Sequence, residues 1–356
     1  MLTFLFFLIV ILGVVFPKSK LIRYIQYVCI YVVFVFNSWS QDEFSYRRIY
    51  EGYYGVSHEP SFDYLCQICY ENGVSFEAFR IVYVSIAVLL ILRAFYAIFR
   101  NASNRAYSLI MLYPLLPLAE LLRNLMAIAI VLNGASWYFS QKKETIKEKL
   151  IFMGVIFLGA TFHYNVLCFL IMLLPNTLKP KKTTYLLIVI ISIASISVCN
   201  VPLFRMLLTL LIASEKILRW FDPSMRIGQG IILVLAAHSI SFILYDFIYR
   251  EYCSKIKDID ELKRKLFKVY SLNVYSFFLL GLYTYNMEFF TRLYIVVILL
   301  NCFIIASVAQ RIKTYNMFLL NVVHLVYHIA LFLFLCRPFD EDGIMGMILY
   351  NNYLFP

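Results

Sequence analysis

The sequence predicts an all-α integral membrane protein whose chain crosses the bilayer about twelve times. Hydrophobic residues make up 62% of the 356 residues, charged residues make up 15%, and the mean hydropathy is +0.78. A soluble domain usually contains about 45–50% apolar and about 25% charged residues. Apolar runs also recur along the whole chain, and a bilayer can bury them all, whereas a single soluble core cannot. We therefore expect one polytopic, membrane-embedded domain over residues 1–356.

The apolar runs, taken in order, define the predicted spans. They cover residues 1–17, 21–39, 79–99, 106–118, 121–140, 150–163, 165–178, 183–203, 227–249, 266–286, 289–309 and 315–336. Several runs are shorter than the roughly 20 residues that a straight transmembrane helix needs, so we expect some short or broken helices. Pro114 and Pro117 favour a break in the run that contains them. The first run lacks a preceding basic region and a small-residue cleavage site, which indicates a retained span rather than a signal peptide.

Lysines and arginines are concentrated in alternate gaps between the predicted spans. Such gaps usually face the cytoplasm, so this pattern places both ends of the chain outside. It also explains the net charge of +11 without nucleic acid, because no RNA- or DNA-binding motif accompanies the basic residues. The two substantial outer segments are then a polar, aromatic loop over residues 40–78 and a stretch over residues 204–226. Within the second, Arg205 to Trp220 is predicted to be an amphipathic helix at the membrane surface, with a simple anchoring role as the alternative.

The eight cysteines and five histidines do not form a strong metal or redox pattern. Cys66 and Cys69 form a CxxC, but no second pair follows. His324 and His328 lie one turn apart on the last predicted span and could bind a metal, but no adjacent acidic residue completes a site. Packing is therefore the preferred interpretation of the two histidines. We expect neither a metal nor a cofactor.

Two residues at the predicted outer surface are suited to chemistry. Arg123 begins a span, and its planar fork of donors is suited to binding phosphate. Glu120, three residues earlier, offers the alternative of a purely structural ion pair with Arg123. His163 lies where two short spans meet and can exchange a proton near neutral pH. Taken alone, a buried and hydrogen-bonded imidazole is the preferred interpretation of His163.

Short motifs along the chain resemble, in order, those of the EpsG-like, Wzy-type polysaccharide polymerases. They are Asp42 followed by Tyr46, similar to an acidic and tyrosine-rich first outer loop; Glu59-Pro-Ser-Phe62, similar to a Glu-Pro-aromatic element; Arg123-Asn124 with Ala127, similar to an Arg-Gln-x-x-Ala motif; and Phe162-His163-Tyr-Asn-Val-Leu167, similar to a Phe-His motif. Arg292 resembles an arginine of the later spans. The sequence departs from the family pattern at Asn124, where glutamine is commoner, and at Tyr164-Asn165, where a smaller pair is usual.

The resemblance implies a GT-C-like glycosyltransferase with its active site on the outer face of the bacterial cytoplasmic membrane. It would transfer a growing glycan from polyprenyl diphosphate onto the next lipid-linked repeat unit. Its partners would be the lipid-linked donor and acceptor, the bilayer and possible chain-length and flippase proteins of the same pathway. The implied catalytic residues are Arg123 for the diphosphate, His163 as base or acceptor orienter, and Asp42 and Glu59 for the acceptor sugar, with either carboxylate as the alternative base. The implied substrate-binding residues are Arg292, Arg205, Arg219, Tyr46, Arg47, Tyr50, Glu120, Asn124 and Asn165.

Three alternatives use the same membrane setting. An O-antigen ligase shares the lipid-diphosphate donor but uses another acceptor. An O-acetyltransferase needs an acyl donor and often an early-span histidine, whereas the first histidine here is His58 in an outer loop. A flippase or transporter favours internal repeats and ionisable residues near mid-membrane, and the sequence has no convincing repeat.

Overall fold

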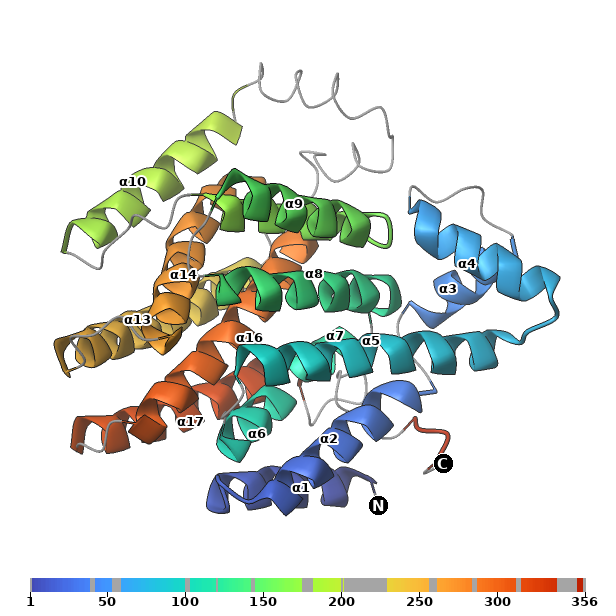
Figure 1. Cartoon of the computed structure of the whole chain (residues 1–356), viewed down its shortest axis with the longest axis horizontal. Helices are drawn as coiled ribbons and strands as arrows, with labels where there is room; N and C mark the ends of the chain where they lie inside the picture. Colours follow the sequence, from blue (N-terminus) through green and yellow to red (C-terminus); the bar gives the residue numbers. More distant parts are fainter. Residues whose placement is uncertain are drawn as a thin grey trace. The chain divides into compact units, whose positions relative to one another are not determined.

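The computed structural model describes residues 2–38, 42–52, 59–99, 103–119, 121–141, 145–174, 182–199, 201, 229–255, 261–283, 287–311, 315–337 and 351–354. Helices dominate these residues, which confirms the predicted all-α class (Figure 1). Within the described ranges there is no β-strand, only an isolated antiparallel bridge between Asn37 and Asn352.

The helices form two compact units. The first comprises Met1–Phe169 and Cys302–Pro356, and the second comprises Leu170–Asn301. The first contains α1 (Leu2–Val15), α2 (Lys20–Val35), α3 (Glu43–Tyr50), α4 (Pro60–Glu71), α5 (Phe76–Ile98), α6 (Asn104–Leu112), α7 (Leu115–Ala119), α8 (Leu122–Ser140), α9 (Ile146–Ala160) and α17 (Tyr315–Leu335). The second contains α10 (Lys182–Cys199), α13 (Gln229–Lys255), α14 (Glu261–Tyr275), η3 (Ser276–Leu279) and α15 (Leu280–Tyr283). The boundaries fall within η1 (Tyr164–Leu173) and α16 (Met287–Arg311).

Each predicted span overlaps at least one helix. By length and composition, three stretches of the described residues can cross a membrane: Phe76–Ile98, Arg292–Gln310 and Phe318–Leu335. Shorter apolar helices occupy Leu2–Val15, Tyr164–Leu173 and Thr183–Val198. The protein is therefore membrane-embedded and helical, while the count of about twelve crossings stays a prediction.

Two of the predicted short spans have an irregular structure. The run over residues 106–118 is broken between α6 and α7 at Tyr113–Pro114, which confirms the break expected from its prolines. The run over residues 165–178 contains the 3₁₀ helix η1. At about 2 Å per residue its ten residues extend about 20 Å, less than the roughly 30 Å of a hydrocarbon core.

Local sequence signals explain where several helices begin. The Ser19 side chain accepts a hydrogen bond from the Ile22 amide at the start of α2. Ser75 does the same for Ala78 at the start of α5. Thr145 and Glu148 form a capping box that starts α9. These side chains satisfy amide groups that the first helical turn leaves without an intrahelical partner.

A layer of three packed helices supports the region of interest in the first unit. Helix α8 packs between α5 and α9, and α3 and α4 lie near one end of this layer (Figure 1). Two glycines allow α8 and α9 to approach closely. A Cβ atom on Gly134 would lie 2.6 Å from Val155 Cγ1, and one on Gly159 would lie 3.2 Å from the Ala127 carbonyl oxygen. The end of α9 therefore packs against Ala127 of α8, which is about one helical turn after Arg123.

Candidate active site

Three motif residues that are far apart in the sequence meet in the first unit. Glu59, directly before α4, forms an ion pair with Arg123 of α8 through its Oε2 atom. Its other oxygen, Oε1, lies 3.7 Å from Nε2 of His163, which follows α9. The three side chains are largely buried, at 3% exposed for Glu59, 15% for Arg123 and 6% for His163. The site is therefore a buried carboxylate held between a cation and an imidazole.

Hydrogen bonds between α4 and the end of α9 hold Glu59 and His163 together. The Ser61 amide donates to the Thr161 carbonyl oxygen at 3.1 Å. The Ser61 hydroxyl donates to the Thr161 hydroxyl oxygen at 2.7 Å. Ser61 is two residues after Glu59, and Thr161 is two residues before His163, so this clamp fixes both side chains to neighbouring positions.

The hydrogen bonding of His163 determines where its neutral ring carries the proton. Nδ1 accepts a hydrogen bond from the Asn165 backbone amide at 3.2 Å. A nitrogen that accepts a hydrogen bond holds a lone pair, so the proton of the neutral imidazole is on Nε2. That nitrogen faces Glu59, and the ring therefore presents a donor to the carboxylate.

Aromatic rings line the guanidinium of Arg123. Its Cζ atom lies 5.4 Å from the ring centre of Tyr46 on α3 and 5.9 Å from that of Phe62 on α4. Such contacts stabilise a cation in a dehydrated site. Tyr46 was predicted to bind substrate, and the structure places it against Arg123.

Two buried amide side chains next to the site have no hydrogen-bond partner among the described residues. The side chains of Asn124 and Asn165 are 1% and 2% exposed, and neither makes a hydrogen bond within the described part of the chain. Nε of Arg123 is likewise without a hydrogen-bond acceptor there. A buried polar group without a partner costs about 1–3 kcal/mol, so natural structures rarely keep one unless water or a ligand satisfies it. These atoms leave donors and acceptors that water or a polar ligand could satisfy.

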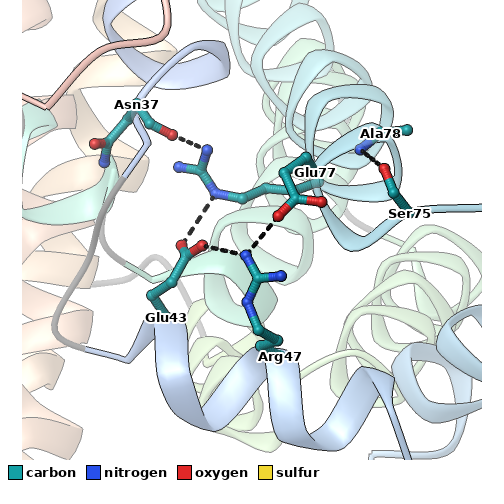
Figure 2. A network of polar contacts seen from close by, with 7 residues as sticks. Asn37, Glu43, Arg47, Ser75, Glu77 and Ala78 are labelled. Atoms are coloured by element: carbon teal, nitrogen blue, oxygen red, sulfur yellow. Dashed lines mark hydrogen bonds and ion pairs between the residues drawn. The ribbon is translucent and has the colours of Figure 1, made fainter. Parts of the chain in front are cut away.

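A second network of charged residues connects Glu43 and Arg47 of α3 with residues of α5 (Figure 2). Arg47 Nη2 lies 2.6 Å from Glu77 Oε1 and 3.6 Å from Glu43 Oε1. Arg80, which is 3% exposed, donates to the Asn37 carbonyl oxygen, and its Nε lies 3.7 Å from Glu43 Oε2. Burial raises the pKa of the Glu43 carboxyl group, and the two arginines oppose this effect. The network fixes α3 to α5, which positions Tyr46.

The remaining predicted residues have different surroundings. Asp42 precedes α3, is half-buried, and has no ion pair to Arg123 or His163 among the described residues. Tyr50 is buried, donates its hydroxyl to the Val74 carbonyl oxygen at 2.6 Å, and packs against aromatic rings of α4 and α5. Their proposed roles in sugar binding stay predictions.

Four further residues of the predicted site lie in the second unit or outside the described residues. Arg292 belongs to the second unit, on α16, and is half-buried. Glu120, Arg205 and Arg219 lie outside the described residues. The same holds for the predicted surface helix that contains the last two.

The sequence motifs identified Glu59, Arg123 and His163 separately but not their contacts. Glu59 and Arg123 are 64 residues apart, and only the sequence neighbour Glu120 was considered as a partner for the arginine. The Ser61–Thr161 clamp and Gly159 were not identified either. Glu59 and His163 are two potential metal ligands, and no third histidine, cysteine or carboxylate joins them among the residues that the structure describes.

The comparisons with known proteins agree with the motif pattern. The family model described as "EpsG family" matches residues 20–352, a range that contains Glu59, Arg123 and His163. No curated protein and no solved structure matches the chain. The protein belongs to the EpsG family and is a membrane protein of the polysaccharide-polymerase type.

Proposed function

We propose that this protein transfers a growing glycan from polyprenyl diphosphate onto the next lipid-linked repeat unit, on the outer face of the bacterial cytoplasmic membrane. The observation that carries the proposal is the buried contact of Glu59 with both Arg123 and His163. It combines a cation suited to a leaving diphosphate with a carboxylate suited to accept a proton. Family membership supports the reaction class.

The chemistry requires one bond to form and one to break. The acceptor hydroxyl oxygen attacks the anomeric carbon of the donor, and the bond from that carbon to the diphosphate oxygen breaks. The electron pair leaves with the lipid diphosphate, whose developing negative charge Arg123 stabilises. The hydroxyl proton passes to a base in the site. Tyr46 and Phe62 hold the guanidinium in place for this role.

Glu59 is the base that this geometry favours. Nδ1 of His163 already accepts the Asn165 amide, and its Nε2 carries the proton that faces Glu59. The imidazole therefore acts as a positioning group whose N–H points toward the carboxylate across 3.7 Å. When the donor diphosphate binds Arg123, the guanidinium shifts from Glu59 to the phosphate oxygens, and the carboxylate becomes available for the acceptor hydroxyl.

The proposal is tested by the length of surface polysaccharide in a deletion strain complemented with each variant. Arg123→Ala and Glu59→Gln are compared with Arg48→Ala on α3 and Glu71→Gln on α4, which keep the site intact. Wild type and both controls should restore long chains. The two site variants, at equal membrane abundance, should leave mainly single repeat units. Loss of one transition-state donor, as in Arg123→Ala, typically lowers the rate about 10²–10³-fold, and loss of a general base, as in Glu59→Gln, lowers it about 10²–10⁴-fold.

The other outcomes identify the alternatives. Full-length polymer from Arg123→Ala would refute the diphosphate role. Long chains that accumulate without attachment in the deletion strain would indicate a ligase, and repeat units retained on the cytoplasmic side would indicate a flippase.

Substitution of His163 separates positioning from proton transfer. His163→Gln keeps a side-chain donor for Glu59, so a positioning role predicts substantial residual activity with an unchanged pH profile. His163→Ala removes the donor and should be more impaired. If both variants are equally impaired and the low-pH limb is missing from the profile of their residual activity, His163 rather than Glu59 is the base.

A further inference from the structure

Three potential metal ligands converge elsewhere in the first unit. Cys302 of α16 and His324 and His328 of α17 are each at most 1% exposed. Their ligand atoms all lie within 4.8 Å of one another. The two histidines are one turn apart on the same helix face, and the neighbouring helix supplies the thiol.

The two imidazoles have nitrogen atoms available for a ligand. Nδ1 of His324 and Nε2 of His328 are buried and make no hydrogen bond to any described residue. The other nitrogen of His328, Nδ1, lies 2.9 Å from the Tyr113 carbonyl oxygen. A metal-binding histidine commonly donates its second N–H to a backbone carbonyl, which fixes the ring and leaves the opposite lone pair for the metal. His328 has this arrangement.

We propose that Cys302, His324 and His328 bind one Cu(I) ion. Thiolate ligands favour soft metals, and a three-coordinate set of one sulfur and two imidazoles is typical of copper rather than of magnesium or calcium. The ion binds as the Cys302 thiol loses its proton to the solvent, so a copper–sulfur bond replaces the sulfur–hydrogen bond without any change in oxidation state.

The charge of the surroundings favours a monovalent ion over Zn²⁺. Arg105 interacts electrostatically with all three residues, and its guanidinium donates to the Asn321 carbonyl oxygen. Cu(I) with one thiolate is neutral, whereas Zn²⁺ with one thiolate keeps a positive charge beside the arginine. In a buried site, that additional repulsion is expensive.

The distances require only a small contraction. Metal–nitrogen bonds of about 2.0 Å and metal–sulfur bonds of about 2.3 Å place the ligand atoms about 3.5–3.8 Å apart in a trigonal site. Side-chain rotation that closes the present separation of at most 4.8 Å by about 1 Å therefore completes the site.

The test uses the purified full-length protein in detergent, titrated anaerobically with Cu(I) held by a competing colorimetric chelator. The wild type should take up and retain one copper per chain. Its X-ray absorption spectrum should show one sulfur and two nitrogen ligands. This measurement uses the wild type alone, so it tests the ligand set even if a variant fails to fold. Cys302→Ser and His328→Ala should lose at least nine-tenths of the bound copper.

Matched cysteine variants serve as controls. Cys336→Ser removes another buried thiol of the same unit and should retain one copper. Cys66→Ser/Cys69→Ser removes the CxxC and should also retain it. The proposal is overturned if the wild type retains no copper, if the double CxxC variant loses it, if the spectrum lacks sulfur, or if equimolar Zn²⁺ displaces the copper.

Discussion

Removal of either member of the Glu59–Arg123 pair should destabilise the protein strongly. Removal of both together should cost less than the sum of the two single substitutions. Both side chains are largely buried, so a charge left alone cannot be fully hydrated. Loss of one partner of a buried pair typically costs about 3–5 kcal/mol, mainly because the other charge stays uncompensated. Arg123→Gln should lie near the upper end, since Glu59 is the more buried partner. Glu59→Gln should lie near the lower end, because the Tyr46 and Phe62 rings still face the guanidinium.

A double-mutant cycle measures this coupling. The Glu59→Gln/Arg123→Gln variant should cost at least about 2 kcal/mol less than the sum of the single variants, as found for residues in direct contact. Labelling of the Cys66 thiol, followed by mass spectrometry of its peptide, gives the local free energy of opening, because Cys66 is 1% exposed on α4. Glu71→Gln with Arg48→Gln provides a control cycle of residues that should add independently.

The result that refutes the reasoning is additivity. If the Glu59 and Arg123 effects sum to within about 0.5 kcal/mol, the two charges do not stabilise one another in the folded protein. A coupling equal to that of the control cycle leads to the same conclusion. The proposed release of Glu59 on diphosphate binding then loses its structural basis.

Three further predictions concern the supporting structure. Gly159→Ala should destabilise the protein by about 1–3 kcal/mol, because its Cβ would lie 3.0 Å from Val131 Cγ2, and Val131→Ala should recover part of this loss in thermal unfolding. Deletion of residues 351–356 removes the 2.7 Å hydrogen bond from the Ser38 amide to the carbonyl oxygen of Asn351. Hydrogen exchange at the Ser38 amide should therefore accelerate, and an unchanged exchange rate would contradict the contact. Burial raises the pKa of the Cys66 thiol from 9.0 to about 12, so the folded protein holds this proton more tightly. The stability of the wild type relative to Cys66→Ala should therefore fall by about 1.4 kcal/mol between pH 8 and pH 10, and a constant difference in unfolding free energy would refute this.

Local sequence predicted much of the helical pattern but few of the contacts between helices. Composition and apolar runs predicted the class, and Pro114 predicted the break between α6 and α7. These features depend only on residues that are close in the sequence, so the sequence alone predicts them. The pairing of Glu59 with Arg123 depends on packing of α4, α8 and α9, which no local pattern encodes. The same reason applies to the proposed copper site, where the sequence pairs His324 with His328 but does not place Cys302, on another helix, beside them.

The ion pair also suggests how a membrane enzyme tolerates a phosphate-binding arginine when no substrate is bound. An isolated arginine in a buried site is costly, and a nearby carboxylate removes most of that cost. If the same carboxylate is the base, its proton-accepting oxygen stays occupied until a diphosphate takes over the guanidinium. Binding of the lipid-linked donor would then activate Glu59 at the moment when the acceptor hydroxyl needs it. This coupling predicts that Glu59→Gln, which keeps an acceptor oxygen for Arg123 but cannot take the proton, binds the donor while failing to elongate it. Direct donor-binding measurements on that variant test the prediction, and loss of donor binding would assign Glu59 a structural role instead.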